Sequence, residues 1–300
     1  MTHFRAILMF VAAFSVATLS SAEDGDPGPS CSSQATGLLV FVNAGALKAS
    51  NNTAIFYSGR PENVNNVDRI LHSELYGPSI WQNLTEQDLI NSSISNYQML
   101  SVDEYGLMRY NIAFQVGLGL RYDYKSGFGW MLKFDVAQLN AVGAFNLNAT
   151  TGVGELQQRS RYVRCAVAGS ERRINIDFGI TKKINLTTNM SLDLNAGLNV
   201  VNTKVQSNDV EIGGEIYSIL DVWDGQTPSY YTQPYEYINQ GGLGLGGFAT
   251  AALCRNFAGI GTVSLGYTSY YSHINLEGYP LYGWQHNVFL RFEINNFIFL

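Results

Sequence analysis

The chain has 300 residues, of which 46% are hydrophobic and only 14% are charged, and its mean hydropathy is close to zero. With 18 Tyr, 16 Phe and 4 Trp, it is too aromatic and too weakly charged for a disordered chain. A helical membrane protein would need apolar runs of about 20 residues, which the chain lacks beyond its N-terminal region. Because the net charge is -6, nucleic-acid binding is disfavoured.

The first 22 residues are typical of a secretory signal peptide. A positive start and an apolar core of roughly 12 residues, too short for a membrane anchor, precede small residues that end at Ala22. We expect residues 1–22 to be removed and residues 23–36 to form a flexible periplasmic leader before a single domain at 37–300. The three cysteines, Cys31, Cys165 and Cys254, allow at most one disulfide.

The clearest pattern in the chain is a strict alternation from Met108 to Tyr122. Every even position is large and apolar, whereas no odd position is. On a helix this spacing would spread apolar side chains around the whole circumference, but on a strand it places them on one face. The sequence therefore predicts a strand. The same period of two recurs at residues 38–48, 128–137, 174–180, 190–200, 241–254, 260–272 and 285–294.

Two all-β architectures produce such alternation, the soluble sandwich and the closed barrel in a membrane. The alternating segments reach about 10 residues or more, whereas strands of globular proteins average about 5 or 6. Their apolar face carries Met108, Tyr110 and Tyr122 near the ends, where a membrane barrel has aromatic girdles. We expect an antiparallel up-and-down transmembrane β-barrel of eight strands. Ten strands, or a soluble sandwich, are the alternatives.

The opposite face of the predicted strands carries charges of both signs. Four cations and four anions lie on it: Arg109, Arg121, Lys133 and Arg291 with Asp135, Asp177, Asp193 and Glu293. In a barrel that faces lipid this side lies inside, where charges persist only when they are paired. The equal numbers predict an interior plug of ion pairs and amides in place of an open pore.

The connections between the predicted strands alternate in length, as in a membrane barrel with short periplasmic turns and long outer loops. The longer ones span residues 49–105, 141–172, 206–240 and 273–283, and the short ones 123–127, 181–186 and 255–259. Because the number of strands is even, we expect both termini in the periplasm.

From Leu38 to Ile294 this pattern resembles the small eight-stranded outer-membrane barrel proteins of the OmpA and OmpX type. The resemblance is one of architecture, without a diagnostic motif. The run from Phe289 to Leu300 is similar to the aromatic-rich last strand through which such proteins meet the barrel-assembly machinery, although it does not end on Phe. The resemblance implies a place in the outer membrane of a diderm bacterium, surrounded by its lipid.

The sequence offers no convincing catalytic, cofactor or metal site, so we expect a protein that is not an enzyme. His72, Ser73 and Glu74 are consecutive, and their side chains therefore point in different directions and cannot form a catalytic relay. No pair of His or Cys residues has metal-ligand spacing. The glycines at 242–247 are not followed by the helix that a nucleotide-binding loop requires.

The long loops are where we expect binding, because loops 49–105 and 206–240 are acidic and the latter is rich in aromatic residues. Tyr and Trp dominate binding hot spots. The candidate recognition residues are Tyr217, Trp223, Tyr230, Tyr231, Tyr235 and Tyr237. Packing of these rings on the barrel rim is the alternative, since exposed aromatic residues need shelter.

Loop 141–172 is basic and offers a second candidate surface. Its candidate contacts to lipopolysaccharide phosphates are Arg159, Arg161, Arg164 and Arg172, because the guanidinium group suits phosphate geometry. The alternative is a solvated loop whose arginines pair with acidic neighbours.

The sequence thus predicts a non-enzymatic outer-membrane barrel whose loops bind an extracellular protein or glycan. One alternative function is transport of a small apolar solute with lateral release. A second is modification of membrane lipid, which the missing catalytic residues disfavour.

Overall fold

The computed structural model describes residues 37–90, 97–150, 160–220, 240–257 and 261–294, all within one compact unit, Gln34–Leu300. The expected signal peptide and leader, residues 1–36, lie outside the described residues. No helix in the described ranges is long and apolar enough to cross a membrane.

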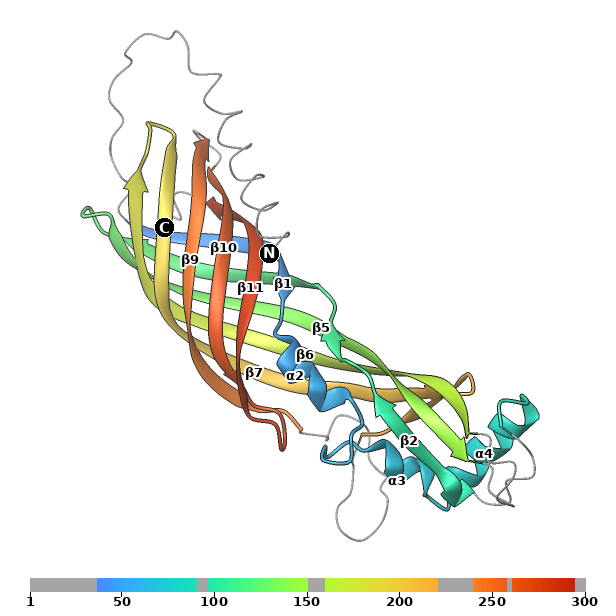
Figure 1. The fold of residues 1–300 in the computed structure, drawn as a ribbon. Coiled ribbons are helices and arrows are strands. Elements are labelled where there is room, and N and C mark those ends of the chain that lie inside the picture. Colours follow the sequence, from blue (N-terminus) through green and yellow to red (C-terminus); the bar gives the residue numbers. More distant parts are fainter. Residues whose placement is uncertain (1–36, 91–96, 151–159, 221–239, 258–260, 295–300) are drawn as a thin grey trace. The chain divides into compact units, whose positions relative to one another are not determined.

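Eight antiparallel strands form a closed ring in which neighbours in the chain are neighbours in space (Figure 1). They are β1 (Gly37–Lys48), β4 (Ala113–Asp123), β5 (Phe128–Thr150), β6 (Ser160–Asn185), β7 (Met190–Ile212), β9 (Leu243–Phe257), β10 (Gly261–Ile274) and β11 (Leu281–Ile294). Pairing of β1 with β11, from Val40↔Ile294 to Lys48↔His286, closes the ring. The predicted all-β, up-and-down barrel of eight strands is confirmed, and the sandwich and the count of ten are wrong.

Tight connections lie at the end of the barrel where β1 begins and β11 ends, which we call the short-turn end. Between β4 and β5, the amide of Tyr124 donates to the carbonyl oxygen of Phe128 at 2.8 Å. Gly127 in this turn has φ of 74°, a left-handed conformation that favours glycine. The turn at residues 186–189 is closed in the same way, by a bond from the amide of Leu186 to the carbonyl oxygen of Met190.

The expectation of a loop at 141–172 is wrong for most of its length. β5 and β6 remain paired from Phe128↔Lys182 to Thr150↔Ser160, and they have 23 and 26 residues. A membrane crossing needs only about 9 to 11 residues, so the strands continue well beyond one. β7 extends beside β6, while β2 (Leu100–Tyr105) pairs with β5 and β8 (Glu215–Ser218) pairs with β7. A sheet of five strands, β2, β5, β6, β7 and β8, therefore projects from the end of the barrel opposite the short turns, which we call the long-loop end.

Short helices from the first long connection pack against this projecting sheet (Figure 1). They are α2 (Asn51–Ala54), η1 (Ile55–Tyr57), α3 (Val67–Leu71), α4 (Gly77–Glu86) and η2 (Tyr97–Met99). In α4, Pro78 occupies the first turn, where its missing amide costs nothing, and Ile80 and Leu84 lie one turn apart on the buried face. We call these helices and the projecting sheet, which comprise the described residues 49–90, 97–112, 139–150, 160–171 and 203–220, the cap.

Apolar side chains from the helices and the projecting strands form one core. It includes Phe56, Val67, Leu71 and Leu84 from the helical segment and Leu139, Phe145, Val167 and Val205 from the strands. The inward face of β5, β6 and β7 is therefore polar within the ring and apolar in the cap.

A one-residue irregularity precedes β4 and reverses the side-chain faces. Tyr110, in the two-residue β3 (Arg109–Tyr110), pairs with Ala141, whereas Gln115 pairs with Ala137, so five residue steps oppose four. An extra residue of this kind moves every side chain before it to the other face. Met108 and Tyr110 are consequently buried and Arg109 is exposed. The predictions that Arg109 faces the interior and that Met108 and Tyr110 belong to an outer girdle are wrong.

Glycines inside the ring make room for aromatic rings of adjacent strands. A Cβ added to Gly119 would lie 2.2 Å from Cζ of Phe41, and one added to Gly266 would lie 2.3 Å from Cζ of Phe289. An eight-stranded barrel encloses only enough space for its own side chains. Small residues opposite large ones thus allow the interior to fill.

Replacing Gly119 with Val is expected to destabilise the barrel, because the new side chain overlaps the Phe41 ring and overpacking costs about 1 to 3 kcal/mol or more. The measurement is the urea midpoint of the refolded protein. The control is Gly247→Ala, whose Cβ would meet only the carbonyl oxygen of Gly197, at 3.4 Å. Equal midpoints for wild type and Gly119→Val would contradict this packing.

Candidate functional site: apolar belt, ionic interior and cap

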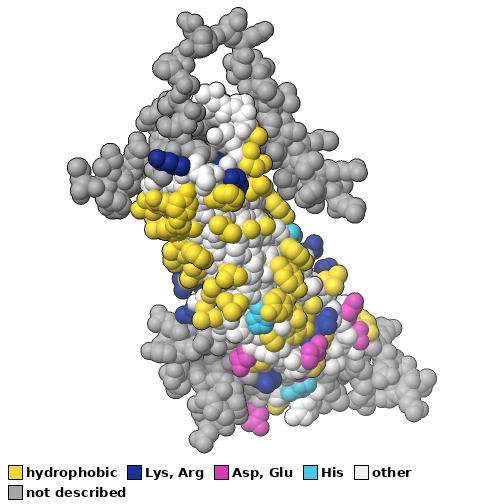
Figure 2. Space-filling model, turned by 90° about the vertical axis from the view of Figure 1, so that its left-hand side faces the viewer, with side chains coloured by type: hydrophobic (Ala, Val, Ile, Leu, Met, Phe, Trp, Pro, Cys, Tyr) yellow, Lys and Arg dark blue, Asp and Glu magenta, His cyan; other side chains and the backbone are white. Residues whose placement is uncertain are grey.

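Large apolar side chains on the outer face are exposed on every strand of the ring. They include Val42, Phe114, Leu118, Phe134, Phe178, Ile180, Leu198, Leu245, Val263 and Leu290. Figure 2 shows part of this belt, with acidic side chains gathered below it toward the cap. From Ile112 to Tyr122 the outward positions cover ten residue steps, which corresponds to about 25 Å of height for a strand tilted by about 40°. The apolar band of a membrane barrel has the same height.

Aromatic clusters border the belt at both ends. At the short-turn end, Tyr122 stacks on Trp130 with ring centroids 6.3 Å apart and meets Tyr124 edge-on at 5.1 Å. At the long-loop end, the Tyr271 ring lies 5.6 Å from that of Tyr282 and 4.9 Å from that of Trp284. Tyr and Trp favour such positions because their rings suit the boundary between lipid and water.

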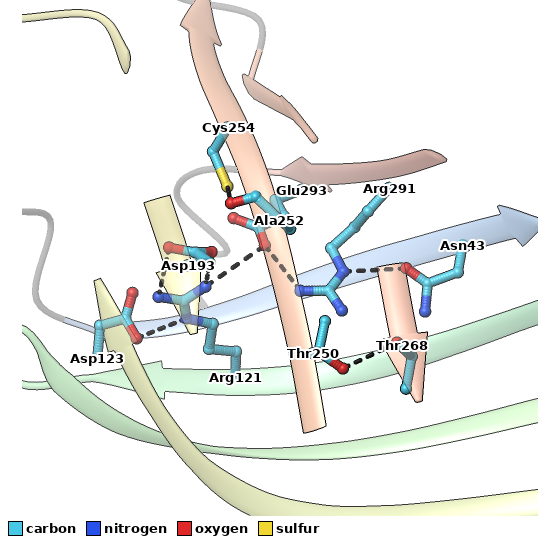
Figure 3. A network of polar contacts seen from close by, with 10 residues as sticks. All are labelled: Asn43, Arg121, Asp123, Asp193, Thr250, Ala252, Cys254, Thr268, Arg291 and Glu293. Atoms are coloured by element: carbon cyan, nitrogen blue, oxygen red, sulfur yellow. Dashed lines mark hydrogen bonds and ion pairs between the residues drawn. The ribbon is translucent and has the colours of Figure 1, made fainter. Parts of the chain in front are cut away.

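The first interior cluster centres on Arg121 (Figure 3). Its Nε donates to Asp123 at 2.6 Å, its Nη1 forms an ion pair with Asp193, and the same Nη1 lies 3.7 Å from Glu293. Glu293 also lies 3.6 Å from Arg291, whose Nε donates to the side-chain oxygen of Asn43 at 3.0 Å. One guanidinium thus connects carboxylates from β4, β7 and β11 across the barrel.

A second interior cluster centres on Lys133, which is buried. Its ammonium lies 2.8 Å from both Asp135 and Asp177, and it donates to the Tyr270 hydroxyl at 2.9 Å. Asn199 donates to the other oxygen of Asp177 at 2.6 Å. Three oxygen atoms thus lie within 2.9 Å of the ammonium, and two of them belong to carboxylates.

A third cluster joins the barrel to the cap. Arg173 forms an ion pair with Glu171 and donates to Gln285 at 2.8 Å and to Thr53 of α2 at 3.3 Å. The Tyr57 hydroxyl of η1 donates to Glu171 at 2.5 Å. Burial, and then the charge of Glu171, raise the pKa of Tyr57 well above its usual value, so this hydroxyl stays protonated and remains a donor.

The structure places seven of the eight predicted plug residues inside the ring, all except Arg109. Sequence reasoning missed Asp123, Glu171 and Arg173, which are also buried. The signal was present, because Glu171 and Arg173 continue the alternation of Asn175 and Asp177. Glu171 fell in the expected loop, however, and Arg173 lay directly after it at the top of the expected strand. Within the described residues the buried charges are therefore six carboxylates and four cations, and the expected equality does not hold.

The candidate loop residues are only partly described. Tyr217 packs edge-on against Tyr76 of the cap at 6.1 Å, whereas Trp223, Tyr230, Tyr231, Tyr235 and Tyr237 lie outside the described residues. Arg164 and Arg172 are exposed on the outer face of β6, while Arg159 and the side chain of Arg161 are not described. Contacts of these arginines with lipopolysaccharide stay a prediction. In the described ranges no group of three His, Cys, Asp or Glu residues is placed to hold a metal.

Comparison with known proteins gave structural likeness alone. No family model and no curated protein matches the chain. Neisserial surface protein A shares 10% identity over 87% of this chain and 98% of its own, with a TM-score of 0.38. The attachment invasion locus protein Ail of Yersinia pestis, solved with the heparin analogue sucrose octasulfate, shares 10% identity over 86% of this chain and 99% of its own, with a TM-score of 0.32. A Pseudomonas aeruginosa FadL homologue shares 9% identity over 87% and 89%, with a TM-score of 0.21.

Replacing Arg121 with Met is expected to lower the free energy of unfolding by about 3 to 5 kcal/mol, because three buried carboxylates lose their shared cation. Urea unfolding followed by gel mobility measures this change. The double variant Arg121→Met/Asp193→Asn should recover part of the loss, and Arg164→Gln, at an exposed arginine, should change little. A single variant as stable as wild type would contradict the central role of Arg121.

Proposed function

We propose that the protein is an integral outer-membrane β-barrel, without enzymatic activity, that presents its cap at the cell surface for binding. The observation that carries this proposal is the combination of an apolar outer face on all eight strands with charges buried inside the same closed ring. In a soluble protein, the exposure of so much apolar surface to water would destabilise the fold. In lipid, the same surface is matched by its surroundings, and ring closure satisfies the backbone of every strand.

The interior supports a structural role for the ring and disfavours a channel. Large side chains such as Arg121, Lys133 and Arg291 are almost fully buried and cross the space between strands. At the long-loop end, the cap core closes the ring with side chains such as Phe56 and Leu139, which are fully buried. A solute passing through the ring would have to break these ion pairs and displace this core.

The cap offers a firm base for a binding surface. The segment that holds most of the candidate recognition residues, 221–239, is attached to the cap at both ends. Ile219 and Leu220 are buried in the cap core on one side. On the other side, the side-chain amides of Gln240 and Asn65 exchange two hydrogen bonds of 2.9 Å. Because its two ends are held, this aromatic segment loses less conformational entropy on binding than a free chain of equal length.

The expected orientation follows the connection lengths. Short turns and both ends of the described barrel share one side, which we place in the periplasm, and the cap is placed outside. The partners in this proposal are membrane lipid, an extracellular protein or glycan, and the barrel-assembly machinery. The last of these would bind β11 and the segment after it.

The membrane assignment is tested by fractionating cells that express the full chain. We expect the protein in the outer-membrane fraction, with faster gel mobility before boiling than after it, because a closed barrel resists detergent unfolding. We also expect no stepwise conductance in planar bilayers. Recovery in the soluble fraction with one gel mobility would contradict the membrane assignment, and stable current steps would favour transport.

The binding role is tested by replacing residues 221–237 with a Gly/Ser linker of equal length. Cells that carry this variant should lose adhesion to those immobilised extracellular proteins or glycans that bind wild-type cells, because the aromatic contact area is gone. The exposed variant Glu74→Gln is the matched control. Surface amounts are compared by heat-modifiable mobility. Undiminished adhesion at equal surface amounts would rule out this segment as the binding surface.

A further inference from the structure

Among the described residues, the charged side chains at the short-turn end that are exposed or half-buried are all basic. The three carboxylates at this end, Asp123, Asp193 and Glu293, are buried in the interior clusters. The basic side chains Lys125 and Lys182 lie on or beside the turn between β4 and β5, and Arg255 lies near the end of β9. This surface therefore carries a positive charge that no neighbouring surface carboxylate in the described ranges offsets.

The opposite end has a different character. The exposed carboxylates of the cap end include Glu62, Glu74, Glu86, Asp88, Asp103, Glu104, Glu211, Glu215 and Glu277. Exposed arginines accompany them, so both signs are present there. The described surface charges are thus of both signs at the cap end and only basic at the short-turn end.

Lys182 is held at the border of the apolar belt. Its ammonium lies 3.9 Å from the centre of the Phe128 ring and donates to the carbonyl oxygen of Ser126 at 3.0 Å. An ammonium has three donors, and this contact uses one of them. Phe128 is exposed by 52%, so the ammonium lies beside a ring that faces outward.

The same arrangement recurs at a second short connection. The guanidinium of Arg255 lies 5.3 Å from the centre of the Phe257 ring. Its strand neighbours at this level are Met190 and Val263, and Val263 is an outward member of the belt. At both connections a cation therefore lies over an aromatic ring where the apolar surface ends.

We propose that the short-turn end binds the headgroup phosphate of anionic phospholipids, with Lys125 and Lys182 as the main site and Arg255 as a second one. This inference rests on the proposed membrane location. The acyl chains of such a lipid lie along the belt, and its phosphodiester reaches the ammonium groups at the aromatic border. An anionic membrane surface attracts each nearby Lys or Arg by about 1 kcal/mol, which is equivalent to about a fivefold preference.

Continuity with the belt favours a lipid over a soluble protein partner. The Tyr122, Tyr124 and Trp130 rings lie at the same end of the barrel as Lys182, and Tyr and Trp favour the level at which headgroups meet acyl chains. A ligand at this level must be apolar where it meets the belt and anionic where it meets the ammonium groups. An anionic phospholipid has both properties.

The test uses Trp130 as a local reporter, since it lies two residues from Phe128 on the same face of β5. The full chain with Trp81, Trp223 and Trp284 replaced by Phe is refolded into vesicles of phosphatidylcholine with a minority of phosphatidylglycerol. Bromine is carried either by the phosphatidylglycerol or by an equal fraction of the phosphatidylcholine. The ratio of the two quenching efficiencies measures the local enrichment of the anionic lipid.

We expect a quenching ratio of about five or more at Trp130 in the parent protein. The ratio should fall toward one in the double variant Lys125→Gln/Lys182→Gln, and also in the parent protein at high salt. Lys204→Gln, at the long-loop end, is the matched control and should leave the ratio unchanged. A ratio near one in the parent protein, or one that survives the double substitution, would overturn the proposal. Absence of quenching by either brominated lipid would overturn this proposal together with the membrane location.

Discussion

The pairing of β1 with β11 is the contact on which the other features depend, because it leaves the ring without an open edge. Closure fixes the width of the interior, and each side chain of the ring must then face either the outside or that narrow space. Phe41, Phe289 and Tyr270 are buried in that space and leave little of it for water around the charges. Charged side chains that point inward therefore have to find partners on other strands, as Arg121 does on β7 and β11.

The inward face changes chemistry along the longest strands without a break in hydrogen bonding. On β5 the inward positions pass from Lys133 and Asp135 through Ala137 to Leu139. The first two belong to the ionic interior and the last to the cap core. Arg173 lies at this border, and its contact with Thr53 together with the Tyr57 contact to Glu171 joins the two regions. The cap is therefore an extension of the barrel wall and is not a separate domain on a hinge.

Alternation predicted the ring well because closure imposes one rule on every strand. Arg121, Lys133 and Asp177 could be placed inside from their parity alone, since each lies in an unbroken run. Parity failed at Arg109, because a single extra residue before β4 reverses the faces and has no mark of its own in the sequence. It also failed for residues 141–172. There the strands leave the lipid level, and the outward positions of Ala166, Ala168 and Ser170 no longer need to be large and apolar.

The cap has a consequence for the order in which the molecule can be completed. Its helical residues lie between β1 and β4, yet they bury their apolar side chains against β5, β6 and β7, which come later in the chain. Contacts between such distant segments form late, because the intervening chain must first be ordered. The segment emerges early but has nothing to pack against until three further strands are in place. The surface of the cap can thus exist only on a barrel whose wall is already built, so display of that surface reports correct assembly.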